Sequence, residues 1–506
     1  MRRVSAAGAA HAGQVAVPEP VPLKGRALRE RIEALESVAR QLEPGRPERD
    51  RLRSPVIAHS ESFYEGLDDA LTYRVTDDKG AGLLEIPIAE EGIGIEKALR
   101  IVGEHVDRAG LNPAAGGHLA YVPGGGLFAS SLGDYLADVG NHYAGVFFAT
   151  PGAVRMENLL VRWMARLVGY PEGALGTLSS GGSIANLTAI VTARDAMEVG
   201  GRRVHRSPVY LTQQVHHCVT KALRLAGLAE APLRRVPMDE RFRMRPDELA
   251  RMIAADRAAG LRPWLVVASS GTTDTGAIDP VDEIAEVAEA AGVWLHVDAA
   301  YGGFFLLTGI GRSKIRGLEC SDSVVMDPHK GLFLPYGTGA LLVRQGELLA
   351  RSQWYEANYL QDALDSTEEV SPADLSPELT RHFRGLRMWL PLVLHGVAPF
   401  RAALEEKIQL CRYFYEELSG IPGMQRGPYP ELSVALYRYV PRAGDANEFN
   451  ARLIREVRRD GRVFLSSTTI DGTFWLRLAV LCFRTHRRHV DLALQVLREK
   501  IAEIEG

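Results

Sequence analysis

Residues 322–331 read DSVVMDPHKG, a short apolar run followed at once by an acid, a proline, a histidine and a lysine. A continuous apolar run of this length is typical of a buried strand in a parallel sheet. Lys330 therefore follows the carboxyl end of a strand, which is where open α/β sheets bind their ligands. An amine placed there can condense with an aldehyde to form a Schiff base. A solvated lysine after a strand is the alternative interpretation.

Similar apolar runs recur on both sides of this stretch, and segments with helical spacing separate them. The runs are SPVYLT (207–212), RPWLVVASS (262–270), VWLHVDAA (293–300) and GALLVR (339–344), with a helical segment such as 281–291 between two of them. This alternation predicts an α/β domain with a mostly parallel sheet.

The flanking segments have a different character. Residues 23–42 carry apolar side chains at helical spacing among charges, which predicts an amphipathic arm. After residue 395, a helical segment precedes strand-like runs such as LSVALYRYV (432–440), and the chain ends in another helical segment. We therefore predict three parts, listed in order: an N-terminal tail and helical dimerisation arm over 1–117, a large α/β domain over 118–395, and a smaller α+β domain over 396–506.

The composition argues against several classes of protein. The chain carries 59 Lys+Arg and 63 Asp+Glu among 506 residues, a net charge of −4, so it lacks the basic character of a nucleic-acid-binding protein. The absence of a run of about 18 apolar residues predicts no membrane span. Four cysteines without a CxxC pair are typical of a cytoplasmic protein. The N-terminus lacks the apolar core of a signal peptide, with a transit peptide as the alternative.

Three further polar signals precede the lysine. Residues 179–183 read SSGGS before a helical segment, so a helix N-terminus can bind a phosphate there, although a capped Gly-rich turn is the alternative. An imidazole of His216 or His217 can stack on an aromatic ring; adjacent histidines are expected to point apart, so we expect no metal site. Asp298 ends an apolar run and needs a positive partner if it is buried, unless it is a structural or helix-capping residue.

In this order, the residues resemble the group II pyridoxal 5'-phosphate (PLP)-dependent amino-acid decarboxylases, which include aromatic-L-amino-acid decarboxylases. The resemblance extends from about residue 121 to 484 and rests on SSGGSIANL, VHHCVTKA, SSGTTDTGAID, HVDAAYGG, DPHKG and RHFRGLRMW. It implies the PLP fold-type I (aspartate-aminotransferase-like) architecture, with a mostly parallel seven-stranded sheet in the large domain. It also implies a homodimer, which the predicted N-terminal arm suits.

The resemblance assigns a role to each motif around one cofactor. The implied contacts are Gly181, Gly182 and Ser183 at the phosphate, His216 stacked on the ring with Ala300 beneath it, Thr273 near the 3'-oxygen or the substrate carboxylate, Asp298 at the ring nitrogen, and Lys330 as the Schiff base beside Asp327 and His329. A carboxylate such as Asp298 keeps the ring nitrogen protonated, which makes the ring an electron sink.

The implied reaction is decarboxylation of an L-amino acid, with an aromatic substrate favoured, to an amine and CO2. Tyr359 in WYEANYLQD (354–362), or His216, is implied to return a proton to the substrate Cα, and phenylalanine at the tyrosine position marks related aldehyde synthases. Tyr121, Phe147 and Phe148 are candidate walls of the substrate pocket. The sequence departs from the family at three glycines, Gly124, Gly145 and Gly331, where larger side chains are usual.

Other functions remain open at this point. The same fold supports oxidative deamination coupled to decarboxylation, aminotransfer with Arg477 as a carboxylate clamp, or decarboxylation of an acidic amino acid such as glutamate. A non-catalytic protein with this fold would be expected to lack the lysine or the aspartate, and both are present.

Overall fold

The computed structural model describes residues 22–354 and 368–506. Contacts divide the chain into two compact units, Met1–Tyr64 with Ile88–Val102, and Glu65–Pro87 with Gly103–Gly506. The first unit holds helices α1 (Gly25–Ala39), α2 (Arg46–Glu65) and α3 (Ile95–Val102), none of which buries a residue. None of the helices in the described ranges is both long enough and apolar enough to cross a membrane.

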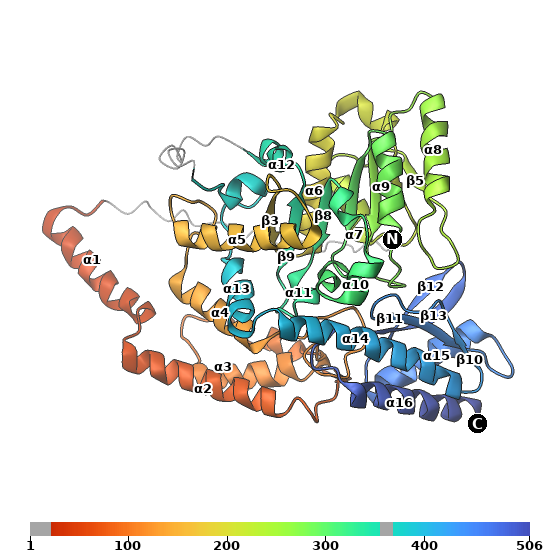
Figure 1. Cartoon of the computed structure of the whole chain (residues 1–506). Coiled ribbons are helices and arrows are strands. Elements are labelled where there is room, and N and C mark those ends of the chain that lie inside the picture. Colours follow the sequence, from red (N-terminus) through yellow and green to blue (C-terminus); the bar gives the residue numbers. More distant parts are fainter. Residues whose placement is uncertain (1–21, 355–367) are drawn as a thin grey trace, which may run out of the picture. The chain divides into compact units, whose positions relative to one another are not determined.

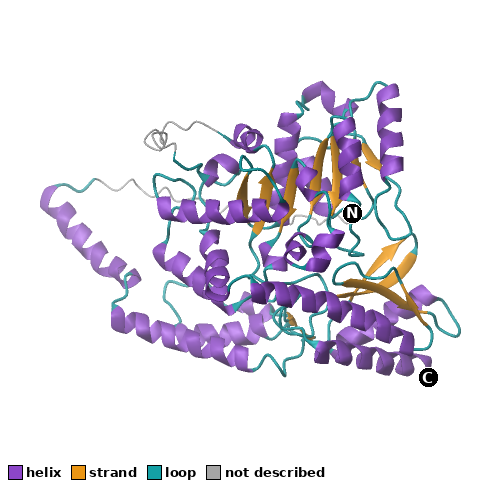
Figure 2. Ribbon diagram, in the orientation of Figure 1, coloured by secondary structure: helices purple, strands orange, loops and turns teal. Residues whose placement is uncertain are grey.

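The second unit is built around a seven-stranded sheet with the strand order β3-β9-β8-β7-β6-β4-β5, which confirms the predicted mostly parallel α/β fold (Figures 1 and 2). The strands are β3 (Leu175–Ser179), β4 (Val209–Leu211), β5 (Leu233–Arg235), β6 (Leu265–Ser269), β7 (Trp294–Asp298), β8 (Ser323–Met326) and β9 (Gly339–Val343). Only β9 runs against its neighbours in this sheet, β3 and β8. The other strands are parallel, so their carboxyl ends meet at one edge of the sheet.

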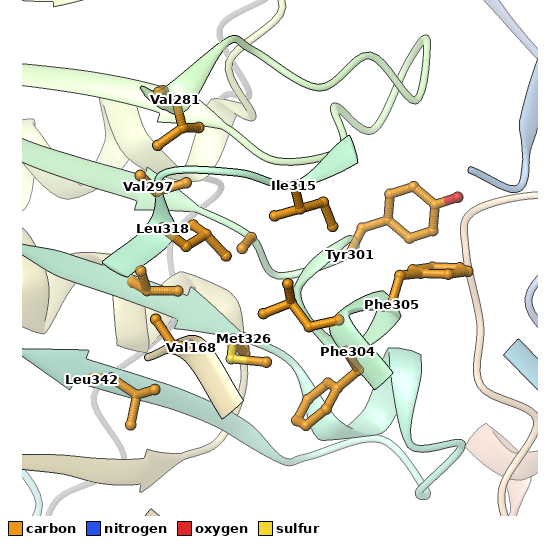
Figure 3. Packing of buried hydrophobic residues seen from close by; sticks show 14 of the residues in the cluster. Val168, Val281, Val297, Tyr301, Phe304, Phe305, Ile315, Leu318, Met326 and Leu342 are labelled. Atoms are coloured by element: carbon orange, nitrogen blue, oxygen red, sulfur yellow. The ribbon is translucent and has the colours of Figure 1, made fainter. Parts of the chain in front are cut away.

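Both faces of this sheet are buried, because successive side chains of a strand point to opposite faces. Leu295 and Val297 of β7 belong to one apolar cluster, which includes residues of α5 (Pro151–Val168), α8 (Pro246–Ala258) and α9 (Val281–Ala290) and is seen in Figure 3. Trp294 of the same strand belongs to the other cluster, which includes residues of α6 (Gly182–Ala196), α7 (His217–Leu225) and α12 (Gly346–Gln353). Burial on both faces explains why these strands are continuous apolar runs.

The C-terminal region forms an antiparallel sheet with the order β10-β11-β13-β12. Its strands are β10 (Met424–Arg426), β11 (Val434–Tyr439), β12 (Ser466–Ile470) and β13 (Thr473–Ala479), and its helices are α14 (Ala398–Glu417), α15 (Ala446–Asp460) and α16 (Arg487–Glu505). This region and the seven-stranded sheet belong to one compact unit. The two predicted domain boundaries, after residues 117 and 395, stay predictions.

The remaining elements connect these parts of the second unit. They are β1 (Tyr73–Arg74), β2 (Gly110–Leu111), α4 (Phe128–Gly140), α10 (Gly309–Lys314), α11 (Pro328–Gly331) and α13 (Arg384–His395). Helix α13 packs extensively on α4 and α5.

Candidate functional site

A cavity of about 270 Å3 lies at the carboxyl ends of β6, β7 and β8 and at the N-terminus of α6. Every cofactor contact that the sequence predicted lines it, namely Gly181, Gly182, Ser183, His216, Thr273, Ala300, Asp298, Asp327, His329 and Lys330. The parallel strands bring these residues together from segments more than a hundred residues apart, because each segment follows a strand that ends at the same edge. The structure thus places the residues in one site, whereas the role of each stays a prediction.

Lys330 lies on α11, a single turn that begins at Pro328. Its backbone N–H donates to the carbonyl oxygen of Asp327 at 2.9 Å, and its Nζ lies 3.0 Å from Asp327 Oδ2. Burial alone would lower the pKa of the Lys330 amine, but the charges of Asp327 and Asp298 outweigh burial and raise that pKa. A raised pKa favours the protonated form of the amine, which must lose its proton before it can attack an aldehyde.

The Asp298 carboxylate ends β7 and is 9% exposed. Its Oδ1 accepts a hydrogen bond from the backbone N–H of Ala300 at 3.1 Å, and its Oδ2 accepts one from Asn186 Nδ2 at 3.3 Å. The side chain is thus held as an acceptor at the edge of the cavity.

The segment between β3 and α6 forms a cradle of backbone N–H groups. Gly181 has φ +154°, a region that favours glycine, and α6 begins at the next residue. A Cβ at Gly182 would lie 2.9 Å from Asp327 Oδ2, and a Cβ at Gly339 of β9 would lie 2.5 Å from the carbonyl carbon of Gly181. Small residues are required here because neighbouring backbone and carboxylate atoms approach closely. The N–H groups at the start of a helix that have no partner within the helix can donate to an anion.

The two carboxylate oxygens of Asp327 differ in their hydrogen-bond partners. Its Oδ2 pairs with Lys330, whereas its Oδ1 is buried without a hydrogen-bond partner among the described residues. His329 Nδ1 donates to the carbonyl oxygen of Thr338 at 2.5 Å, and burial lowers the pKa of His329. An anion cradle, an amine, a carboxylate and a buried unpaired acceptor around one cavity fit an aldehyde phosphate with a protonated ring nitrogen, as PLP is.

His216 caps the N-terminus of α7 through its Nδ1, which accepts from the backbone N–H of Cys218 at 3.3 Å. Burial lowers the pKa of His216, and the charge of Asp298 partly opposes this effect. The rings of His216 and His217 lie 4.1 Å apart, so the prediction that adjacent histidines point apart is wrong here. Among the described residues, no group of three His, Cys, Asp or Glu side chains is arranged to hold a metal ion.

The loop that carries Thr273 is held from behind by Arg477 of β13. Arg477 Nε donates to the carbonyl oxygen of Asp274 at 2.8 Å, its Nη2 donates to that of Thr273, and its Nη1 donates to Ser466 Oγ at 2.8 Å. Arg477 does not line the cavity. The arginine considered as a carboxylate clamp for aminotransfer is thus engaged with backbone carbonyls.

The predicted substrate walls lie elsewhere on this chain. Tyr121 and Phe148 are 53% and 64% exposed, Phe147 is buried beneath Arg155, and none of the three lines the cavity. Their contact with a substrate stays a prediction. Tyr359 lies outside the described residues.

The three glycines that depart from the family pattern are sites of close packing. A Cβ at Gly124 would lie 2.5 Å from the carbonyl oxygen of His329, and one at Gly331 would lie 2.6 Å from Phe304 Cβ. A Cβ at Gly145 would overlap the carbonyl oxygen of Leu379. Surrounding atoms therefore occupy the space that a larger side chain would need at these positions.

The RHFRGLRMW motif, residues 381–389, braces the site. Arg381 donates to the carbonyl oxygen of Leu178 at 2.6 Å, at the end of β3, and pairs with the buried Glu157 at 2.9 Å. Arg387 donates to the carbonyl oxygen of Tyr336 at 3.0 Å, on the segment that follows Lys330. The motif thus fixes both the anion cradle and the lysine segment.

Sequence reasoning missed several residues of the site. Cys218, Tyr301 and Asn186 also line the cavity, and His296 and Ser323 lie behind it as fully buried polar side chains. Polar residues inside otherwise apolar strands were the signal available for the last two, because such residues need buried partners. The partners come from distant segments, so the sequence could not identify them.

Comparison with known proteins agrees with this geometry. Residues 117–421 match the pyridoxal-dependent decarboxylase conserved domain. An aromatic-L-amino-acid decarboxylase of Bacillus atrophaeus is 32% identical over 76% of this chain and 81% of its own, and a phenylacetaldehyde synthase of Petunia hybrida is 29% identical over 80% and 84%. The crystal structure of Oryza sativa TDC with PLP and tryptamine superposes with a TM-score of 0.86 at 26% identity, covering 91% of this chain and 99% of that one. The chain belongs to the pyridoxal-dependent decarboxylase family and is a PLP-dependent amino-acid decarboxylase.

Proposed function

We propose that this enzyme decarboxylates an aromatic L-amino acid to the corresponding amine and CO2, with its cofactor attached to Lys330. The observation that carries the assignment is that the Lys330 amine, the Asp298 carboxylate and the N-terminus of α6 all line one cavity. The aromatic substrate is supported by the similarity to the aromatic-L-amino-acid decarboxylase. When bound, PLP supplies an electron sink for the bond that breaks.

Each residue of the cavity has its own role in this proposal. The first turn of α6 binds the phosphate, and Asp298 holds a proton on the ring nitrogen. His216 and Ala300 enclose the ring, and His216 or Tyr359 delivers a proton to the substrate Cα after CO2 leaves. Lys330 would hold PLP through its Nζ atom when no substrate is bound.

The attachment is tested by reducing the PLP-loaded enzyme with borohydride and mapping the labelled peptide by mass spectrometry. We expect the label on Lys330 and its loss in Lys330→Ala. Lys221→Ala, which changes an exposed lysine on α7 of the same unit, is the control and is expected to keep the label. A label on another lysine of the wild-type enzyme contradicts the assignment.

The substrate is tested by incubating the enzyme with a panel of aromatic and acidic L-amino acids and measuring amine and CO2. We expect amine from at least one of tryptophan, tyrosine, phenylalanine and dihydroxyphenylalanine. If only glutamate or aspartate gives an amine, the aromatic substrate is overturned, whereas the assignment as a decarboxylase still holds.

Oxidative conversion to an aldehyde is a second candidate, because the phenylacetaldehyde synthase of Petunia hybrida is a relative. Tyrosine rather than phenylalanine at position 359 favours plain decarboxylation. Measuring aldehyde, ammonia and hydrogen peroxide beside the amine separates the two reactions. Aldehyde and peroxide in equal amounts, with little amine, would favour the oxidative function.

A second copy of the chain is the partner that we propose. Helix α4 exposes a row of apolar side chains at helical spacing, each 44% to 68% exposed, namely Phe128, Leu132, Tyr135, Leu136 and Val139. Helix α1 likewise exposes Leu28, Ile32 and Leu35. Apolar rows of this extent mark interaction surfaces, and most soluble oligomers are homodimers.

The four cysteines are all unpaired, which supports a cytoplasmic location.

A further inference from the structure

Three fully buried polar side chains lie behind Asp298 in an otherwise apolar region. Asn186 on α6, His296 on β7 and Ser323 on β8 are each 0% exposed. Buried polar groups are costly unless they are hydrogen-bonded, so their partners define what they do.

The orientation of the Asn186 amide is fixed by the acceptors that face its nitrogen. Nδ2 donates to the carbonyl oxygen of Gly182 at 2.8 Å and to Asp298 Oδ2 at 3.3 Å. Rotating the amide by half a turn would place its oxygen against a carbonyl and a carboxylate, which are acceptors only. The amide oxygen therefore faces the opposite way, toward His296.

The tautomer of His296 follows from this orientation. Its Nε2 lies 2.8 Å from Asn186 Oδ1, so Nε2 carries the hydrogen and donates it. Its Nδ1 lies 2.8 Å from Ser323 Oγ and accepts from that hydroxyl, which in turn accepts from Trp294 Nε1 at 3.0 Å. Burial lowers the pKa of His296 to about 4, so the ring is neutral at ordinary pH.

Together these bonds form a chain in which every donor points toward Asp298. The order is Trp294, Ser323, His296, Asn186 and then the Asp298 carboxylate. The same Asn186 nitrogen also holds the Gly182 carbonyl, at the start of the anion cradle. One side chain thus links the predicted phosphate site to the predicted partner of the ring nitrogen.

We propose that Asn186 and His296 are positioning residues, which hold the Asp298 carboxylate in the orientation in which it keeps the ring nitrogen of PLP protonated. This inference rests on the role of Asp298 in the proposed function. The physical reason is that the Asn186 amide donates to one oxygen of the carboxylate, which fixes its orientation and leaves its other lone pairs free to accept. Other titratable groups that interact with Asp298 are His216, Cys218 and Lys330, so the variants are chosen to leave these unchanged.

The test uses Asn186→Leu and His296→Leu, full-length and loaded with PLP labelled with 15N in the ring. The 15N chemical shift reports directly whether the ring nitrogen carries a proton. We expect both variants to move this shift toward the unprotonated value between pH 6 and 8, and to weaken PLP binding about 10- to 100-fold, the size expected for losing a buried hydrogen bond to a charged group. His296→Gln, which keeps a donor toward Asn186, is expected to recover part of the shift.

Asn450→Leu is the matched control. Asn450 is also 0% exposed and bonds only to the backbone, at Tyr439 and Ala446 in the C-terminal region. Its loss is expected to lower thermal stability and leave the 15N shift of bound PLP unchanged. If it shifts the resonance as Asn186→Leu does, the effect is general loosening and the proposal fails.

Two more variants separate the possible failures. Asp298→Asn is expected to move the 15N shift most; if it does not, the assigned role of Asp298 fails, and the inference fails with it. If Asp298→Asn moves the shift but Asn186→Leu does not, the inference alone is overturned. Ser323→Ala removes only one oxygen and is expected to fold even if the leucine variants do not. If the 15N shift does not move in this variant, the claim that the hydrogen bonds from Ser323 through His296 and Asn186 act on Asp298 is overturned.

Discussion

At the scale of single residues, the site is governed by which charges face Lys330. Asp327 and Asp298 raise the pKa of its amine against the effect of burial, so the ammonium form is favoured before the cofactor arrives. Attachment of an aldehyde requires the neutral amine. The Asp327 carboxylate, which pairs with Lys330, would therefore slow the attachment of PLP to this lysine at neutral pH.

Asp327→Asn is expected to move the pH midpoint of PLP attachment downward. Without the Asp327 charge, burial lowers the pKa of Lys330, so the neutral amine is present at lower pH. The measurement is the rate of attachment to the cofactor-free enzyme from pH 6 to 10. Asp256→Asn, a change at a carboxylate paired with Arg234 outside the cavity, is the control and should leave the midpoint in place. An upward shift in Asp327→Asn would contradict the argument.

His118 provides a second residue-scale prediction, on stability. It is 0% exposed, and burial lowers its pKa from 6.5 to about 4. Between these pH values the unfolded chain binds more protons than the folded one, so His118 makes stability fall as the pH falls through that window, by on the order of 3 kcal/mol. In His118→Phe the melting temperature is expected to depend less steeply on pH from 6.5 to 4. His395→Phe, at an exposed histidine, should keep the wild-type slope.

At the scale of elements, the anion cradle depends on strand β9 as much as on α6. Gly339 does not line the cavity, yet a Cβ there would lie 2.5 Å from the backbone of Gly181. The strand and the cradle are in close backbone contact, so a change in β9 would displace the predicted phosphate site. This dependence is invisible in the GALLVR segment of the sequence.

Gly339→Ala is expected to weaken PLP binding by about tenfold or more, because moving the cradle spoils hydrogen bonds to a charged group. Titration of the cofactor-free enzyme with PLP, followed by fluorescence, measures the change. Gly173→Ala, where a Cβ would meet nothing within 4 Å, should bind PLP as the wild type does. Equal affinity in both variants would show that the cradle is not held by β9.

At the scale of the whole molecule, the proposed dimer makes a direct prediction. Leu132→Asp with Leu136→Asp places two charges on the exposed apolar row of α4 and is expected to give a monomer by light scattering. Leu225→Asp changes another exposed leucine, 63% exposed at the end of α7, and should leave the wild-type mass. A wild-type chain that is monomeric at micromolar concentration would refute the dimer.

The sequence predicted those strands whose burial can be recognised from a single stretch of apolar residues. Strands β6, β7, β8 and β9 are buried on both faces and are therefore continuous apolar runs. By contrast, β3 (LGTLS) contains small and polar residues, β5 (LRR) is short and mostly charged, and neither was predicted. Lys330 and Asp298 could be predicted because each follows a strand that ends at the ligand edge. The chain from Ser323 to Asn186 could not, because it joins three distant segments. Tyr121 and Phe148, predicted as walls of the substrate pocket, are exposed on this chain, and their contact with a substrate stays a prediction.

The antiparallel pairing of β8 with β9 has a consequence for turnover. Met326 of β8 pairs with Ala340 of β9. Residues 327–339, which include Lys330, therefore form a loop whose two ends lie side by side in the sheet. The Lys330 amine is therefore held near the site by both strands. If Lys330 carries the cofactor, as proposed, each new attachment would be an intramolecular encounter at high effective concentration. The sheet itself would then keep the amine next to the cofactor.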